Sequence, residues 1–331
     1  MGDLLLQCGV TRCAPNFVEA EGAQIARAAK TLRGGRLVAF PTETVYGLGA
    51  DATNDKAVAA IFAAKGRPRF NPLIVHVPGV AQAQALVEFS SLATRLAEAF
   101  WPGPLTLALP RKADCPLSLL VSAGLDTVAV RAPAHPIAQR LLEAAGVPIA
   151  APSANRSGHV SATTAAHVAQ DFGSRVDLVL DGGPSARGLE STVIGFENGK
   201  GVLLRPGAVS RQELARIAGE LQTPERGHVS SPGQLASHYA PRAALRLNAA
   251  SARSDEALLA FGANVPQGAA VVRNLSPSGD LVEAASNLFA MLRELDSSGV
   301  HRIAVMPIPD RGLGEAINDR LQRAAAPRES T

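Results

Sequence analysis

Three cations lie close together in the sequence, at Lys65, Arg67 and Arg69, around a glycine and a proline. They follow a loop at residues 41–49 that holds two threonines, a glutamate and a tyrosine. Ammonium and guanidinium groups beside hydroxyls suit a polyanion such as a nucleoside triphosphate. A basic turn after a helix is also an ordinary solvated cap that complements the helix dipole. This motif alone therefore leaves both interpretations open.

The same pattern recurs along the chain, because several apolar runs end in one polar or cationic side chain. These residues are Thr44, His76, Arg131, Ser153 and Arg205. A guanidinium is costly to bury unpaired, so Arg131 should meet a carboxylate or an anionic ligand. Ser153 and Asn155 could bind phosphate or ribose, although both are also common turn residues. Together, these placements predict one polar crevice beyond the ends of the strands.

Alternating strands and helices must position these groups. Arg36–Phe40 is a short apolar run typical of a buried strand, and Asn54 is the predicted N-cap of a helix over 55–64. Ser161 is the predicted N-cap of a helix over 163–171, and a helix N-terminus is itself an anion site. Further helices are expected at 19–32, 81–89, 91–100 and 136–145, and further strands at 72–77, 105–109, 127–131, 147–151, 176–180, 188–196 and 201–205.

The C-terminal part repeats the alternation on a smaller scale. Strands are expected at 244–247, 269–272 and 303–307, and helices at 254–261, 281–295 and 314–325. This order predicts a small parallel sheet. Residues 221–242 show no clear periodicity, and their length favours a functional linker. We therefore expect a first domain at 15–220, the linker at 221–242, and a second domain at 243–331.

Composition narrows the class of protein. A chain of 331 residues with 47% hydrophobic residues can form one large or two ordinary domains. The net charge of +3 permits an anionic substrate or weak RNA contact, and 4% aromatics argue against a binder built on base stacking. Cys8, Cys13 and Cys115 lack metal-site spacing, so we expect unpaired thiols in a reducing cytoplasm. We expect neither a signal peptide nor a membrane span.

Common catalytic motifs do not occur in this sequence. There is no G-x-x-x-x-G-K-[ST] loop, no G-x-S-x-G elbow and no H-E-x-x-H helix. Residues 47–52 match G-x-G-x-x-A, but Arg69 stands where a dinucleotide site would place an acid. If the chain is an enzyme, positioning and charge neutralisation should carry the catalysis, as in phosphoryl or nucleotidyl transfer.

Eight short motifs occur in order along the chain. They are P-T-E-T-V-Y-G-L-G (41–49), K-G-R (65–67), N-P-L-I-V-H-V (71–77), W-P-G-P-L-T (101–106), V-R-A-P (130–133), A-P-S-A-N (151–155), G-L-E-S-T-V (188–193) and L-R-P-G (204–207). Together they resemble the YrdC/Sua5 family of threonylcarbamoyl-AMP synthases. The resemblance covers about residues 15–220, and H-Y-A-P at 238–241 extends it into a C-terminal domain of the Sua5 type.

The resemblance implies a fold and a reaction. The fold would be α/β, a twisted open mixed sheet with a basic concave surface, followed by a smaller Rossmann-like parallel α/β domain. The enzyme would be a nucleotidyltransferase, an L-threonylcarbamoyladenylate synthase. It would convert L-threonine, bicarbonate or CO₂, and ATP into threonylcarbamoyl-AMP and pyrophosphate. Downstream transferase machinery would then place the group on adenosine 37 of tRNA (t6A), with at most a weak direct tRNA contact and no membrane partner.

The resemblance also implies roles for individual residues. It assigns L-threonine to Thr44, His76, Arg131, the Ala151 backbone and Ser191. It assigns ATP to Arg67, Asn71, Thr127, Ser153, Ser161 and Arg205. Lys65, Arg67, Ser153 and Asn155 match the K-x-R and S-x-N signature of the catalytic group. Mg²⁺ would arrive with ATP without a dedicated protein site.

The linker is implied to close over this site through His238 and Tyr239. Many relatives carry a basic and an aromatic residue just before H-Y-A-P, where this chain has Leu235 and Ala236. The contact of the linker with phosphate is therefore open. The sequence also leaves open the oligomeric state and the role of the second domain.

Two other functions compete with the synthase. One is a non-catalytic RNA-binding or ribosome-assembly protein that uses a basic concavity. The other is a carbamoyl-adenylate enzyme with a different acceptor, as in hydrogenase maturation. Relatives of that kind carry acylphosphatase-like and zinc-finger domains, and this sequence shows no match to either.

Overall fold

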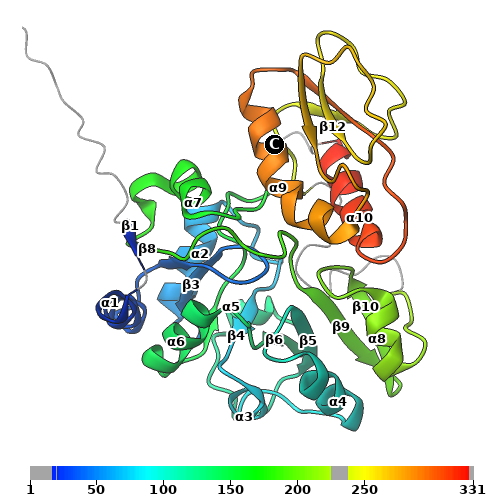
Figure 1. Cartoon of the computed structure of the whole chain (residues 1–331). Coiled ribbons are helices and arrows are strands. Elements are labelled where there is room, and N and C mark those ends of the chain that lie inside the picture. Colours follow the sequence, from blue (N-terminus) through cyan, green and yellow to red (C-terminus); the bar gives the residue numbers. More distant parts are fainter. Residues whose placement is uncertain (1–16, 20, 225–237, 328–331) are drawn as a thin grey trace, which may run out of the picture.

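The computed structural model describes residues 17–19, 21–224 and 238–327. Within them the predicted α/β fold is confirmed, with a large mixed sheet and a smaller parallel sheet (Figure 1). No helix in these ranges is both long and apolar enough to cross a bilayer. The predicted domain boundaries at 220 and 242 stay predictions.

The large sheet of the first domain has ten strands in the order β1-β8-β2-β3-β7-β4-β6-β5-β9-β10. In chain order these are β1 (Phe17–Glu19), β2 (Val38–Phe40), β3 (Gly47–Asp51), β4 (Ile74–His76), β5 (Leu105–Pro110), β6 (Thr127–Arg131), β7 (Ile149–Ala150), β8 (Leu178–Asp181), β9 (Thr192–Glu197) and β10 (Lys200–Arg205). The central strands β4 and β6 run parallel with His76 opposite Arg131. The sheet register thus brings two predicted site residues together.

Helices cover both faces of this sheet. They are α1 (Gly22–Arg33), α2 (Asp55–Lys65), α3 (Val80–Gln84), α4 (Ser91–Phe100), α5 (Leu119–Ser122), α6 (Pro136–Ala145), α7 (Ala165–Phe172) and α8 (Arg211–Ala218), with a 3₁₀ turn at Gly173–Arg175. Successive strand side chains point to opposite faces, so Phe40 packs with α1 and α6 while Ala39 joins the core on the other side. Both faces are therefore buried, as the continuous apolar strands predict.

Local capping explains where α2 begins and ends. The Asn54 side chain accepts hydrogen bonds from the backbone N–H groups of Lys56 and Ala57, which confirms the predicted N-cap. Gly66 ends the helix in the left-handed conformation, with φ of 62°. This sharp stop turns the chain directly into the basic segment at 65–69.

Two predictions about the first domain are wrong. Residues 47–49 were expected in a loop, but they begin β3, which pairs antiparallel with β2. The glycines hid this strand, although they are required because a Cβ at Gly49 would lie 2.8 Å from the Phe40 ring. Ser161 does not cap α7, because Thr164 accepts the hydrogen bond from the His167 N–H.

The second domain contains a four-stranded parallel sheet in the order β11-β14-β12-β13. Its elements are β11 (Ala244–Arg246), β12 (Ala257–Ala260), β13 (Val271–Asn274), α9 (Leu281–Ser297), β14 (Arg302–Val305) and α10 (Gly314–Ala325). The helix expected at 254–261 is wrong, because this segment contains the fully buried strand β12. A four-residue run that is buried on both faces shows no alternation of apolar and polar residues. The sequence therefore does not distinguish a strand from a helix there.

The two domains are in direct contact. Helices α9 and α10 lie on the side of the second domain that faces the first (Figure 1). Three ion pairs join the domains, between Arg211 and Glu315, Arg293 and Asp171, and Arg320 and Glu190. The apolar core of the second domain also takes in residues of the first, including Val45, Val160 and Leu189. The interface thus continues the core of the second domain.

Candidate active site

One cavity collects most of the predicted site residues. Its lining includes ten of them, namely Thr44, Arg67, His76, Arg131, Ala151, Ser153, Ser191, Arg205, His238 and Tyr239. They come from β4, β6, β10, the turn after α2, the loops around β2, β7 and β9, and the segment at 238–239. Side chains up to about 195 residues apart in the chain thus meet in one place, as the strand-end pattern predicts.

Arg131 is fixed on one wall of the cavity. Its Nε donates to the Gly103 carbonyl at 3.1 Å, and its terminal nitrogens donate to Thr44 Oγ1 at 2.8 Å and to Glu43 Oε1 at 2.7 Å. Thr44 is itself held by the Thr42 hydroxyl at 2.8 Å. A guanidinium has five N–H groups, so these contacts leave two that can donate to a carboxylate in the cavity.

Glu43 is an ion-pair partner that the sequence did not identify. Burial raises the pKa of this carboxyl, but the charge and hydrogen bond of Arg131 outweigh that effect and hold the pKa below its usual range. Glu43 is therefore ionised and orients Arg131. A buried guanidinium predicts such a carboxylate, and Glu43 lies in the quoted P-T-E-T motif, so a signal was present.

His76 stands beside Arg131 as a neutral group. It is 3% exposed, and its Nδ1 has no hydrogen-bond partner among the described residues. Burial, and then the charge of Arg131, lowers the pKa of His76 to about 3. The ring packs edge-on against Phe40 with centroids 6.1 Å apart. The cavity wall therefore contains an uncharged imidazole, and its Nδ1 can form a hydrogen bond with a ligand.

Two further arginines face the cavity from other elements. Arg67 donates to Asn71 Oδ1 at 2.7 Å and to the Pro72 carbonyl at 2.8 Å, which places Asn71 behind it as a support. Arg205 donates to the Ser191 carbonyl at 2.8 Å. Burial lowers the pKa of both guanidinium groups, that of Arg67 to about 10, so both stay charged at neutral pH. Together they form a cationic wall suited to phosphate oxygens.

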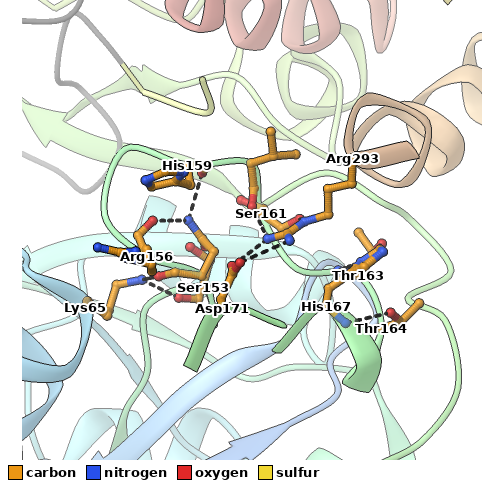
Figure 2. Close-up of polar contacts among 12 residues, drawn as sticks. Lys65, Ser153, Arg156, His159, Ser161, Thr163, Thr164, His167, Asp171 and Arg293 are labelled. Carbon is orange, nitrogen blue, oxygen red and sulfur yellow. Dashed lines mark hydrogen bonds and ion pairs between the residues drawn. The ribbon is translucent and has the colours of Figure 1, made fainter. Parts of the chain in front are cut away.

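Lys65 and Asn155 lie next to the cavity without lining it. Lys65 Nζ donates to the backbone carbonyls of Ser153, at 2.6 Å, and of Asn155 (Figure 2). The Asn155 amide donates to the carbonyls of Arg156 and His159, each at 2.8 Å. Burial lowers the pKa of Lys65 well below its ordinary value. In this structure both residues brace the loop that presents Ser153.

The structure places two of the predicted ATP residues elsewhere. Thr127 lies at the opposite end of β6 from Arg131, in a separate groove with Pro110 and Phe196. Four residues of strand span about 13 Å, so Thr127 is out of reach of this cavity wall. Ser161 donates its hydroxyl to Glu190 Oε1 at 2.5 Å instead of capping a helix. It touches the cavity only through that glutamate.

Sequence reasoning missed Glu190, which lines the cavity, and Arg320, which forms an ion pair with it. Glu190 lines the cavity, and its Oε2 accepts from Arg320 Nε at 2.9 Å. Arg320 is fully buried, although it belongs to α10 of the second domain. It follows Ile317 by three positions on the buried stripe of that helix. The sequence did hold a signal for Arg320, because it is a cationic residue on the apolar face of a predicted helix.

The charged side chains of the cavity are already engaged. Glu190, which lines the cavity, and Glu43, which adjoins the lining residue Thr44, each pair with an arginine. Across the described part of the chain, no group of three or more His, Cys, Asp or Glu side chains could hold a metal ion.

Family models match both parts of the chain. A model described as "Telomere recombination", for Sua5, YciO and YrdC proteins, matches residues 30–207. A second, described as "Threonylcarbamoyl-AMP synthase, C-terminal domain", matches residues 209–326. The first model alone spans more than half of the chain.

Whole-chain relatives give the same result. A Pyrococcus abyssi protein named threonylcarbamoyl-AMP synthase is 43% identical, covering 90% of this chain and 93% of the relative. A Bacillus subtilis protein with the same name is 41% identical, covering 92% and 94%. The crystal structure of P. abyssi Sua5 complexed with L-threonine superposes with a TM-score of 0.86 at 39% identity, covering 94% of this chain and 97% of that one.

Proposed function

Because the chain belongs to the Sua5/YrdC family and has the two-domain Sua5 architecture, we propose that it is an L-threonylcarbamoyladenylate synthase. It converts L-threonine, bicarbonate or CO₂, and ATP into threonylcarbamoyl-AMP and pyrophosphate. The observation that carries this proposal is the single cavity in which Arg131, Thr44 and His76 lie beside Arg67 and Arg205.

Arg131, Thr44 and His76 suit an amino-acid substrate. The two remaining N–H groups of Arg131 clamp the threonine carboxylate, a geometry that a lysine could not reproduce. Neutral His76, Thr44, Ser191 and the Ala151 backbone supply hydrogen bonds for the hydroxyl and amine. The L-threonine in the P. abyssi structure supports this assignment.

The second wall suits a triphosphate. Arg67 and Arg205 offset phosphate charge, and Ser153 offers a hydroxyl from a loop that Lys65 and Asn155 hold in place. Glu190 in the cavity wall and Glu43 beside it are paired with arginines, so Mg²⁺ would be held by the phosphates of ATP and would offset their charge.

The chemistry follows from placing the two substrates next to each other. The threonine amine adds to CO₂ and loses a proton, which gives an N-carboxylate. One oxygen of that carbamate attacks the α-phosphorus of ATP as the bond to the β-phosphate oxygen breaks, and pyrophosphate leaves. No protein nucleophile is needed, so the residues act by orientation and by offsetting charge. Cover by His238 and Tyr239 shields the labile carbamate from water.

The product is a reactive mixed anhydride that requires an acceptor. We propose that t6A transferase machinery receives it for tRNA modification in the cytoplasm. A weak tRNA contact is compatible with the net charge of +3.

The test is pyrophosphate release by the purified protein. The proposal requires release that depends on both threonine and bicarbonate, with carbon from labelled bicarbonate recovered in an AMP adduct. Tight, salt-sensitive RNA binding without turnover would favour the RNA-binding alternative. Turnover that does not require threonine would favour a carbamoyl-adenylate enzyme with another acceptor.

A further inference from the structure

A pair of buried hydroxyl groups lies at the wall of the cavity, on Thr106 and Ser191. Thr106 is 0% exposed on β5, and Ser191 directly precedes β9 and lines the cavity. The two strands run parallel side by side, with Leu105 opposite Thr192 (Figure 1). The hydroxyl oxygens of Thr106 and Ser191 are 2.7 Å apart. Thr106 ends the W-P-G-P-L-T motif, to which the proposed reaction has so far assigned no role.

The proton between these two oxygens belongs to Thr106. A hydroxyl has one proton to donate and two lone pairs, and a buried hydroxyl without an acceptor costs free energy. Among the described residues, the Ser191 oxygen is the only hydrogen-bond partner of the Thr106 hydroxyl. Thr106 has no exposed surface through which water could replace it. Thr106 therefore donates its proton to Ser191.

Ser191 is left with its own proton and no free lone pair. Its hydroxyl oxygen accepts from Thr106 and also from Arg205 Nη2, at 3.2 Å. Because both lone pairs are occupied, the Ser191 hydroxyl can only donate to a group in the cavity. The contact with the charged Arg205 guanidinium also polarises this O–H bond, which favours an anionic oxygen as the acceptor.

Thr44, the other hydroxyl of the threonine wall, has the reverse polarity. The Thr42 hydroxyl donates its one proton to the Val45 carbonyl, at 2.6 Å. It must therefore accept the proton of the Thr44 hydroxyl, whose oxygen is 2.8 Å away. Thr44 Oγ1 also accepts from Arg131, at 2.8 Å, so one lone pair and no proton remain for the cavity. Thr44 can therefore only accept from a ligand.

The opposite polarities of Thr44 and Ser191 suit the two kinds of group on an amino-acid substrate. Thr44 accepts from an N–H or O–H group, and Ser191 donates to an oxygen. Threonine offers such an oxygen in its carboxylate, and its carbamate offers two more. Since Ser191 touches Arg205, the oxygen that it binds lies next to the cationic wall. An ammonium group could not take that place, because it has no lone pair.

We propose that Thr106 is a positioning residue that makes Ser191 a hydrogen-bond donor to an anionic oxygen of the amino-acid substrate, on its carboxylate or its carbamate. The identity of the substrate rests on the proposed function. The direction of the hydrogen bond from Thr106 to Ser191 stands on the geometry alone and is measured without substrates.

Neutron diffraction tests the direction of these hydrogen bonds in the wild-type protein. Deuterium-exchanged crystals grown without substrates show where each hydroxyl deuteron lies. We expect the deuteron of Thr106 to point at Ser191 and that of Thr44 to point at Thr42, while the deuteron of Ser191 points into the cavity. A Ser191 deuteron that points at Thr106 would overturn the proposal, whatever the activity of the protein.

Thr106→Val tests the consequence for substrates. Valine keeps the volume and the β-branched shape but removes the donated proton, so Ser191 is no longer held as a donor. If the acceptor is the carboxylate, calorimetry without bicarbonate should show threonine binding weakened by about fivefold or more, as expected for one hydrogen bond. If it is the carbamate, KM for bicarbonate should rise by about fivefold or more. KM for ATP should stay within about twofold, and a loss confined to ATP would refute the assignment.

Two further variants separate positioning from a general loss of packing. Thr106→Ser restores the hydroxyl and should return threonine and bicarbonate parameters to within about twofold of wild type. Thr31→Val is the matched control, because Thr31 is a buried threonine of α1 whose hydroxyl donates to the Arg27 carbonyl at 2.9 Å, outside the cavity lining. It should leave these parameters within about twofold. Equal losses in Thr106→Val and Thr31→Val, or no rescue by Thr106→Ser, would overturn the proposal.

These measurements distinguish a failure of this proposal from a failure of the proposed function. A wild-type protein that releases no pyrophosphate would refute the proposed function, yet the neutron structure would still decide whether Thr106 donates to Ser191. The neutron structure also decides that point if Thr106→Val does not fold. An active wild type with unchanged kinetics and threonine binding in Thr106→Val would refute the role of Thr106 and leave the synthase in place.

Discussion

The guanidinium of Arg131 is oriented before any ligand binds, because three of its N–H groups already donate to Gly103, Thr44 and Glu43. A preformed clamp avoids the entropy cost of ordering a long side chain on binding. Its value for threonine therefore lies in geometry as much as in charge.

Replacing Arg131 with lysine tests that geometry. The variant keeps a positive charge but cannot form the bidentate contact with a carboxylate. We expect kcat/KM for threonine to fall on the order of 100-fold, equivalent to about 2.7 kcal/mol, while KM for ATP changes little. Arg36→Lys, at an exposed arginine, serves as the control. Unchanged threonine kinetics in Arg131→Lys would remove the carboxylate assignment.

His76 gives a prediction for pH. Its pKa in the folded protein is about 3, against about 6.5 in the unfolded chain, so the unfolded state binds more protons between these values. The stability contributed by keeping His76 neutral is present above about pH 6.5 and is lost as pH falls below it. Wild type should therefore lose about 2 kcal/mol more unfolding free energy than His76→Gln between about pH 7 and about pH 5.

Urea unfolding at the two pH values measures this difference directly. His76→Gln keeps a similar volume and removes the titration, so other histidines cancel in the comparison. A stability difference that does not change with pH would show that the buried imidazole accepts a proton in the folded state.

At the scale of elements, most strands and helices with local signals were predicted within one or two residues. The helix expected at 81–89 is an exception, because α3 ends at Gln84, and α8 was not predicted. β6 and α4 match their expected ranges, and α6 begins at the predicted proline. Where a capping residue or a proline bounds an apolar run, the sequence shows where the helix or strand begins and ends. β3 and β12 lacked such signals, because one alternates glycine with small apolar residues and the other is a four-residue run buried on both faces.

The residues of the candidate site also fall into two groups, those that the sequence predicted and those that it did not. Residues at strand ends, such as Arg131 and Arg205, could be foreseen because the sheet brings the ends together. The ATP contact of Thr127 stays a prediction, because this residue lies at the other end of β6 from Arg131 and lines a separate groove. The pair of Glu190 and Arg320 joins positions 130 residues apart, and no local pattern encodes such a contact.

Gly188 gives the prediction at this scale, because its backbone lies close against α9. Its φ is +64°, and a Cβ would lie 2.3 Å from the Ser286 carbonyl oxygen. Gly188→Ala should lose more than the roughly 1–2 kcal/mol that the backbone conformation alone costs. Gly199→Ala is the control for that backbone cost, since Gly199 has φ of +77° and nothing within 4 Å of its Cβ position.

Thermal unfolding of both variants measures the difference. Equal losses would mean that α9 does not rest against Gly188. A larger loss in Gly188→Ala would show that the domains are packed too closely there for a single methyl group.

For the whole molecule, the cavity is lined by the first domain together with His238 and Tyr239. Ligands that bind only the folded chain must stabilise it by mass action. Threonine together with a non-hydrolysable ATP analogue, each at 100 times its dissociation constant, should raise the unfolding free energy by about 2.7 kcal/mol per ligand if the two bind independently. Calorimetric unfolding tests this, and no shift with either ligand would contradict a shared site.

The position of Arg320 in α10 also bears on synthesis at the ribosome. Glu190 emerges 130 residues before Arg320. At about 5–20 residues per second, translation leaves that carboxylate without its counter-charge for on the order of ten seconds. During this interval the nascent first domain lacks the arginine that pairs with Glu190. Premature termination upstream of α10 would therefore yield a polypeptide with the cavity-lining side chains of the first domain but without the ion-pair partner of Glu190.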